Sequence, residues 1–123
     1  MSPEDLIKKA QAAQKQAISP FSNYPVGAAL LANDGTVIFG CNIESKAYPT
    51  TLCAERVAIF SALSCGHRNF LALALVTRDG ATPCGSCRQI LYEYTKNISI
   101  FTSDENGNYN TFSIDELLPN PFG

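Results

Sequence analysis

The chain has 123 residues, of which 46% are apolar and 16% are charged, and this balance predicts a single compact domain spanning residues 1–123. Its net charge of −2, without a run of like charges, argues against nucleic-acid binding, because such proteins neutralise phosphates with clustered Lys and Arg. No apolar run approaches the ~20 residues that span a bilayer, and the acidic first residues are unlike a signal peptide, so we expect a cytoplasmic protein without membrane contact.

The first predicted elements are a helix and a hairpin. Ser2 fits an N-cap followed by proline at the first helical position, which predicts a helix over about 3–18. The apolar run 26–32 predicts a buried strand. An Asn-Asp-Gly turn follows it, and residues 36–41 are expected to form the paired strand of the hairpin.

The middle of the chain predicts a second helix and a third strand. Helix-forming residues extend over 53–65, and their apolar side chains are spread around the helix axis, which is typical of a central, buried helix. Gly66 is expected to end it. The strand predicted over 71–76 is apolar throughout, so we expect both of its faces to be covered.

The last third predicts a helix over about 83–95, strands over 98–103 and 109–112, and a short final helical turn with a capping box. The link between these two strands is only a few residues long, which requires them to pair antiparallel. The expected fold class is therefore α/β, with a mixed five-stranded sheet flanked by helices.

Two short cysteine motifs carry the chemistry: Cys53-Ala54-Glu55, and Pro83-Cys84-Gly85-Ser86-Cys87 about thirty residues later. Three thiolates give zinc three protein ligands and leave one coordination position for water, which a catalytic zinc needs. The carboxylate two residues after the first thiolate is well placed to move the protons of that water. The spacing matches the Cys₃ form of the zinc deaminase pattern.

The electrostatics of such a site follow from its elements. Both motifs open predicted helices, and the partial positive charge of two helix N-termini would offset the formal charge of −1 on zinc with three thiolates. Arg56 could donate hydrogen bonds to the thiolate sulfurs, and donors of this kind tune a metal.

Other interpretations of the cysteines stay open. A structural zinc needs a fourth ligand. Cys65 lies about 18 Å along the helix from Cys53, at ~1.5 Å per residue, and His67 is excluded for a similar reason, whereas Cys41 is not excluded. We favour packing or surface roles for these three residues. A redox role for the C-x-x-C pair would leave Cys53-Ala54-Glu55 unexplained, and the odd number of five cysteines favours reduced thiols.

The chain resembles the small, oligomeric cytidine deaminases of pyrimidine salvage over nearly its whole length. The segments that carry the resemblance are Pro20-Phe21-Ser22-Asn23-Tyr24-Pro25-Val26-Gly27-Ala28-Ala29-Leu30, Gly40-Cys41-Asn42-Ile43-Glu44, Cys53-Ala54-Glu55-Arg56, Pro83-Cys84-Gly85-Ser86-Cys87-Arg88-Gln89 and Glu116-Leu117-Leu118-Pro119. The resemblance implies a three-layer αβα fold, Zn²⁺ as cofactor and a homotetramer.

The resemblance also implies a role for individual residues. Three of them are zinc ligands: Cys53, Cys84 and Cys87. Glu55 is the proton shuttle, and Arg56 lies beside the metal cluster. Arg88 and Gln89 are left without a role.

The remaining implied roles concern the substrate. Asn42 and Glu44 contact the ribose hydroxyls, the Ala54 N–H binds the pyrimidine carbonyl, and the Thr82 carbonyl, where serine is usual, binds the exocyclic amine. Tyr24 stands where the family usually has phenylalanine against the substrate. Two residues match positions near subunit boundaries, and the second would reach a neighbouring active site: Tyr48 and Phe122.

The expected activity is zinc-dependent hydrolytic deamination of cytidine and 2′-deoxycytidine, with ammonia released. A carboxylate at Glu44 repels phosphate, which favours free nucleosides as substrates. The alternatives are a deaminase of a blasticidin-type nucleoside antibiotic and a zinc-stabilised binding module without catalysis. A polynucleotide deaminase fits the net charge less well.

Overall fold

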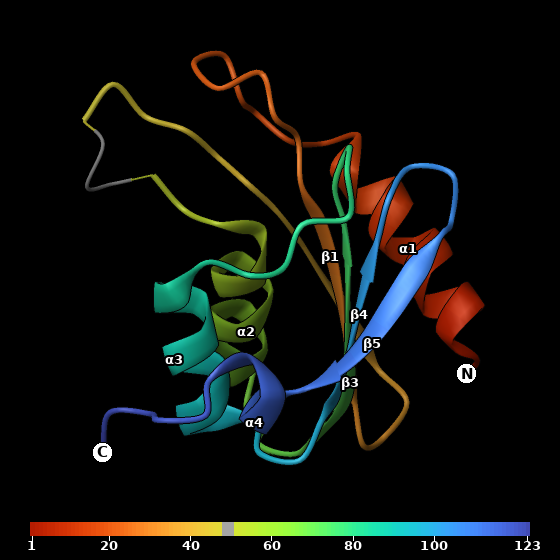
Figure 1. Ribbon diagram of the computed structural model, residues 1–123, viewed down its shortest axis with the longest axis vertical. Coiled ribbons are helices and arrows are strands. Elements are labelled where there is room, and N and C mark those ends of the chain that lie inside the picture. The colour runs from red at the N-terminus through yellow and green to blue at the C-terminus, as the bar shows by residue number, and fades with distance from the viewer. Residues whose placement is uncertain (48–50) are drawn as a thin grey trace.

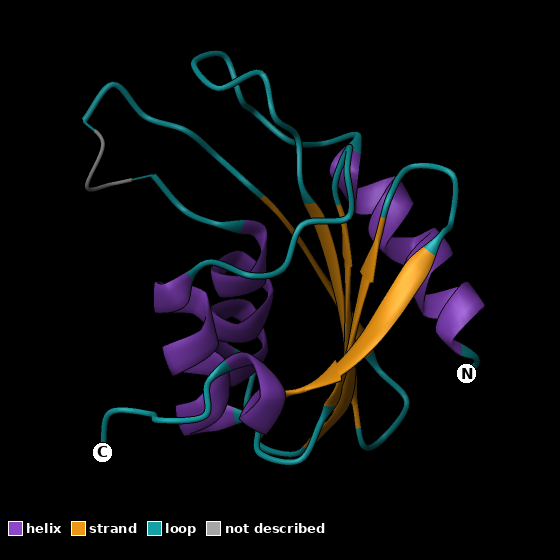
Figure 2. Ribbon diagram, viewed as in Figure 1, coloured by secondary structure: helices purple, strands orange, loops and turns teal. Residues whose placement is uncertain are grey.

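The computed structural model describes residues 1–47 and 51–123, and it arranges them in three layers. A five-stranded sheet lies between helix α1 on one face and helices α2, α3 and α4 on the other (Figures 1 and 2). The elements are α1 (Pro3–Gln14), β1 (Gly27–Ala32), β2 (Val37–Cys41), α2 (Ala54–Ser64), β3 (Phe70–Val76), α3 (Gly85–Tyr94), β4 (Ser99–Ser103), β5 (Tyr109–Ser113) and α4 (Ile114–Leu117). The predicted αβα architecture is confirmed.

The sheet is mixed, with strand order β2-β1-β3-β4-β5. β3 and β4 are parallel and are joined through α3, whereas the other neighbours are antiparallel. The predicted antiparallel pairing of the fourth and fifth strands is confirmed, with Phe101 opposite Thr111.

The central strands are covered on both faces because their alternate side chains enter two different cores. Leu30 of β1 packs with α2, α3 and α4, whereas its neighbour Leu31 packs with α1. Every residue of β1 is buried, and so is every residue of β3 except Leu71, which is 53% exposed. The predicted burial of the third strand on both faces is therefore confirmed for residues 72–76, whereas Leu71 is exposed.

Two helices differ from the prediction. α1 ends at Gln14 instead of near residue 18, because Ile18 leaves the helix to pair with Ile43 in an isolated bridge. α2 covers the sheet with one side only: Ile59 is buried, whereas Phe60 is 42% exposed on the outer side. A helix expected to be central thus has a face on the surface.

Glycines set the distance between the helices and the sheet. A Cβ on Gly40 of β2 would lie 2.2 Å from the carbonyl oxygen of Ala54 and 2.7 Å from the amide nitrogen of Ala58, so α2 packs directly on the strand backbone. Gly27 of β1 makes the same kind of contact with Ala10 of α1. The Gly40 contact fixes the position of the first turn of α2.

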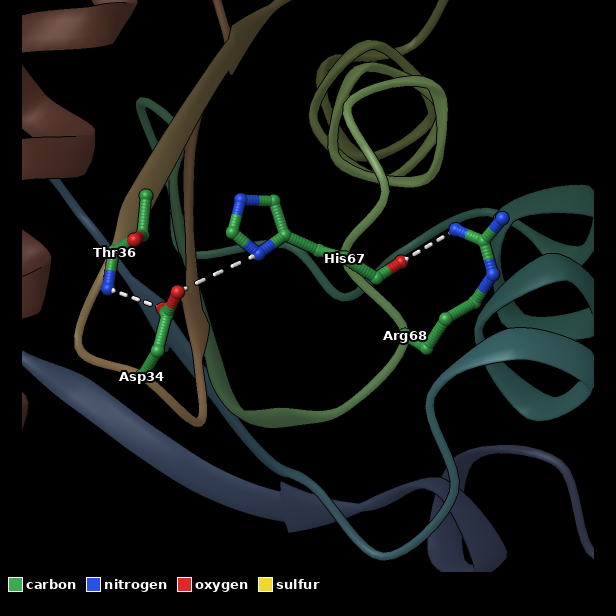
Figure 3. Close-up of polar contacts among 4 residues, drawn as sticks. All are labelled: Asp34, Thr36, His67 and Arg68. Atoms are coloured by element: carbon green, nitrogen blue, oxygen red, sulfur yellow. Dashed lines mark hydrogen bonds and ion pairs between the residues drawn. The ribbon is translucent and has the colours of Figure 1, made fainter.

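A polar cluster ties the β1–β2 turn to the end of α2 (Figure 3). The Asp34 carboxylate accepts a hydrogen bond from the Thr36 N–H at 2.9 Å and lies 4.0 Å from Nδ1 of His67. Arg68 donates to the carbonyl oxygens of Leu63 and His67. This cluster lies at the end of the sheet opposite the cysteines, in keeping with the surface role expected for His67.

Candidate active site

The three thiols meet where α2 and α3 begin. Cys53 and Cys84 are the N-caps of these helices, and Cys87 lies in the first turn of α3. The Cys84 sulfur lies 3.4 Å from that of Cys87 and 3.9 Å from that of Cys53. Two helix N-termini therefore point at one sulfur cluster, as the sequence predicts.

The sulfur cluster fits Zn²⁺. Tetrahedral zinc with bonds of ~2.3 Å to sulfur requires sulfur atoms ~3.8 Å apart. Within residues 1–47 and 51–123, these three are the one group of three or more Cys, His, Asp or Glu side chains whose ligand atoms all lie within 4.8 Å of one another. The candidates for a fourth ligand among the described residues lie outside this group: Cys41, Cys65 and His67.

Arg56 stabilises negative charge on this cluster. Its Nη2 donates to the Cys53 sulfur at 3.2 Å. Hydrogen bonding from Cys87 and then from Arg56 lowers the pKa of Cys53 to about 5, against the opposing effect of burial. The hydrogen bond to Cys53 and burial raise the pKa of Cys87. Arg56 thus favours the thiolate form of Cys53, which is the form that binds a metal.

Glu55 is a buried acid beside the thiols. It is 5% exposed, and burial raises its pKa to about 7, with a further contribution from the negative charge of Cys53. A carboxyl group with a pKa near neutral can both accept and donate a proton at physiological pH. This is the property that a proton shuttle needs.

A cavity of about 390 Å³ opens onto Glu55 and the thiols. Most of the side chains that the sequence singled out line this cavity. The lining residues that had been predicted are Tyr24, Asn42, Glu44, Cys53, Ala54, Glu55, Thr82 and Cys84. The cavity also includes residues without a predicted role, namely Ser22, Val26, Thr51, Leu52, Leu75, Thr77 and Ala81.

Asn42 and Glu44 hold the loop before β1 against the end of β2. The Asn42 amide accepts from the Val26 N–H and donates to the Tyr24 carbonyl, both at 2.9 Å. The Glu44 carboxylate accepts from the Ser22 hydroxyl and from two backbone N–H groups of the same loop. These bonds, the one from the Ser22 side chain first, lower the pKa of Glu44, so its charge is retained at neutral pH.

The opposite wall is fixed by a residue that the sequence did not assign. Arg88 donates to the carbonyls of Pro83 and Leu117 and to the Thr82 hydroxyl, each at 2.7 Å. The planar guanidinium therefore holds the segment that precedes Cys84. Its partners are mostly backbone carbonyls, which leave no mark in the sequence.

Phe122 does not line this cavity, and its side chain is 84% exposed. The Gln89 side chain bonds both the N–H and the carbonyl of Phe122, at 3.1 and 2.8 Å, so the backbone there is anchored while the ring projects outward. Tyr48 lies outside the described residues.

Comparisons with known proteins point to one family. Residues 1–102 match the family described as the cytidine and deoxycytidylate deaminase zinc-binding region. The cytidine deaminase of Sporosarcina psychrophila is 45% identical, over 99% of this chain and 92% of that protein. The crystal structure of cytidine deaminase from Burkholderia pseudomallei superposes with a TM-score of 0.95 at 41% identity, covering 99% of this chain and all of the other. The blasticidin-S deaminase of Bacillus cereus is 30% identical over 80% of this chain and 76% of that protein.

Proposed function

The chain belongs to the cytidine and deoxycytidylate deaminase family, and we propose that it hydrolyses cytidine and 2′-deoxycytidine to uridine and 2′-deoxyuridine with release of ammonia. The observation that carries this proposal is the buried Glu55 beside three clustered thiols in one cavity. We assign residues 1–123 to a single deaminase domain.

Zinc is the cofactor that the donor set fits, and Cys53, Cys84 and Cys87 would hold it. Bound zinc supplies a Lewis acid that lowers the pKa of water from ~15.7 toward neutral. Arg56 helps to keep Cys53 ionised as a ligand through its hydrogen bond to the sulfur.

Glu55 carries the protons of the reaction. Its carboxylate takes a proton from the attacking water and delivers it to N3 of the pyrimidine as water adds to C4. It then takes the proton of the new hydroxyl group on C4 and passes it to the amino group, which leaves as ammonia while the C4 carbonyl forms. The sum is one water consumed and one ammonia released, and Glu55 ends in the state in which it began.

The cavity walls supply the substrate contacts. Ala54 is the first residue of α2, where the backbone N–H has no partner within the helix, so it is available to the pyrimidine carbonyl. The Thr82 carbonyl binds the exocyclic amine, and the Tyr24 ring stacks on the substrate. Asn42 and Glu44 bind the ribose hydroxyls. They do so with the amide hydrogen and the oxygen lone pairs that are not used in their hydrogen bonds to the loop before β1.

Free nucleosides are the proposed substrate class. Glu44 remains ionised at neutral pH because its hydrogen bonds lower its pKa, and a carboxylate at the ribose repels a phosphate. The net charge of −2 also supports a protein without a nucleic-acid partner.

We further propose a cytoplasmic homotetramer that acts in pyrimidine salvage. The tetramer rests on the resemblance to the small cytidine deaminases, and the exposed rings of Phe60 and Phe122 are candidate contacts between subunits. The cytoplasmic location rests on the three thiols, which must stay reduced to bind a metal. Separately, the described residues include no helix of the length and apolar character that a membrane crossing requires. Sedimentation velocity tests the proposed assembly.

The decisive experiment is an ammonia-release assay on purified protein with zinc quantified in the same sample. Turnover of cytidine and 2′-deoxycytidine at about one zinc per chain is expected, with cytidine 5′-monophosphate a much poorer substrate. Absence of turnover in zinc-loaded protein would overturn the proposed activity.

The same assay tests the two alternatives. The 30% identity to a blasticidin-S deaminase favours including that antibiotic as a substrate, and preference for it over cytidine would reassign the protein. A binding module would enclose its zinc with four protein ligands and release no ammonia. The three-thiol cluster beside a cavity supports the enzyme instead.

A further inference from the structure

Asp79, in the loop after β3, joins two residues of the cavity wall without lining the cavity itself. Its Oδ1 accepts a hydrogen bond from the Tyr24 hydroxyl at 2.5 Å and another from the Thr77 hydroxyl at 3.2 Å. Both donors line the cavity, but they come from different loops, one before β1 and one after β3. One carboxylate oxygen therefore connects the two loops.

Tyr24 is the bridging residue on the side of β1. Its N–H donates to the Ser22 hydroxyl at 3.1 Å, and its carbonyl accepts from the Asn42 amide at 2.9 Å. The Arg78 guanidinium lies 5.2 Å from the centre of its ring. The bond to Asp79 fixes the far end of this side chain, so the ring has one orientation against the cavity.

Thr77 extends the connection toward Thr82. Its hydroxyl has a single proton, which goes to Asp79, so a lone pair of the oxygen remains to accept from the Ala81 N–H at 2.9 Å. Ala81 and Thr82 both line the cavity. The carboxylate of Asp79 thus orients the hydroxyl that holds the backbone next to Thr82.

The backbone of Asp79 is itself anchored. Asp79 pairs with Asp104 in an isolated antiparallel bridge at the end of β4. The Asp104 carboxylate in turn accepts from the N–H groups of Asn106 and Asn108 in its own turn. The position of the Asp79 carboxylate is therefore fixed by backbone pairing at the end of the sheet.

We propose that Asp79 is a positioning residue for substrate binding, which fixes the Tyr24 ring and the Thr77–Thr82 wall and makes no contact with the substrate. The inference rests on the proposed function, because it concerns the affinity of that same cavity for a pyrimidine nucleoside. Its effect falls on binding, since the thiols and Glu55 lie outside this set of bonds. A change in KM with kcat retained is its signature.

The test is a double-mutant cycle of Tyr24→Phe and Asp79→Ala. It measures KM and kcat for cytidine and the dissociation constant of uridine by calorimetry. Each single variant is expected to raise KM and the uridine dissociation constant about three- to tenfold, the size of one or two lost hydrogen bonds, with kcat within about twofold. The double variant is expected to match Asp79→Ala, because both changes break the same bond. Additive effects, or unchanged constants in Asp79→Ala, overturn the proposal.

Two further variants serve as controls. Asp79→Asn tests whether the hydrogen bond or the negative charge of Asp79 matters, and Asp34→Ala tests whether loss of any surface carboxylate has the same effect. Asp79→Asn keeps an acceptor oxygen for Tyr24, so near wild-type constants are expected. If Asp79→Asn behaved like Asp79→Ala, charge rather than the hydrogen bond would be at work, and the proposal would fail. Asp34→Ala removes an exposed carboxylate at the opposite end of the sheet and is expected to leave the constants unchanged.

A spectroscopic readout keeps the inference testable apart from turnover. In protein labelled with ¹³Cζ-tyrosine, the Tyr24 resonance is assigned by its loss in Tyr24→Phe. Asp79→Ala is expected to shift it at neutral pH, while Asp34→Ala does not. A Tyr24 resonance that does not move in Asp79→Ala overturns the inference, whatever the activity of the protein. Failure of the wild-type protein to deaminate cytidine counts against the proposed function alone.

Discussion

The guanidinium Nη2 of Arg56 lies 3.2 Å from the sulfur of Cys53, so a cation in the first turn of α2 faces the thiol at the N-cap of the same helix. The two residues are three apart in sequence, the spacing at which side chains of one helical turn meet. The Nε of Arg56 is buried without a partner among the described residues, which indicates that the sulfur contact is what orients this side chain. Substituting Arg56 should therefore act through the metal.

Arg56→Gln is expected to weaken zinc binding about 10- to 100-fold, because the pKa of Cys53 rises when the hydrogen bond and the positive charge are lost. Competition with a chromogenic chelator measures the affinity. Arg56→Lys, which keeps the charge, is the matched control and should lose less. Equal affinity in Arg56→Gln and the wild type would contradict the role of this contact.

Glu55→Gln is expected to retain zinc and to lose turnover by about 10²–10⁴-fold, because the amide fills the same buried space but cannot carry protons. Zinc content and kcat are measured on the same preparation. Retention of more than about a tenth of the wild-type kcat would remove Glu55 from the mechanism.

Cys84→Ala is expected to lose both zinc and activity, because two thiols remain of three. Metal analysis after dialysis against a weak chelator is the measurement. The matched control is Cys65→Ala, which changes an exposed thiol at the other end of α2 and should keep full zinc. Full zinc occupancy in Cys84→Ala would show that this sulfur is not a ligand.

Glu44 should make the acid stability of the protein depend on pH. Its hydrogen bonds, chiefly with the Ser22 side chain, lower its pKa in the folded state. The stabilisation is therefore present above the ordinary pKa of a glutamate and is lost as the pH falls through the lower folded value. The difference in unfolding midpoint between wild type and Glu44→Gln is expected to shrink between pH 6 and pH 3. A difference that stays constant over this range would exclude these bonds as its source.

Arg88→Lys is expected to destabilise the protein by about 1–3 kcal/mol, because an ammonium group cannot make the three diverging hydrogen bonds of the guanidinium. Urea unfolding measures the loss. KM should rise as well, since the Thr82 segment lines the cavity. Unchanged stability would show that these bonds are replaced by water.

The sequence predicted the approach of Cys84 and Cys87 because their spacing is local, whereas Cys53 comes from another helix and was predicted from the zinc deaminase pattern. A C-x-x-C motif at a helix start brings two sulfurs together whatever the rest of the fold does, and the short β4–β5 link leaves only antiparallel pairing. The end of α1 could not be predicted in this way, because Ile18 leaves the helix for a partner 25 positions away.

The supporting contacts were missed for the same physical reason. Arg88 donates to backbone carbonyls, and Asp79 accepts from a side chain of another loop. Neither kind of contact produces a sequence motif. The exposure of Phe60 depends on which side of α2 meets the sheet, which the apolar residues spread around that helix do not specify.

The geometry of the reactive centre depends on the lack of a Cβ atom at Gly40. Because α2 touches the bare backbone of β2, adding a single methyl group at this position would wedge the helix outward near Ala54. Its start would then carry Cys53 and Glu55 away from the two sulfurs that belong to α3. The contact between α2 and Gly40 thus determines both the packing of the helix and the placement of the reactive groups, so a substitution that alters one also alters the other.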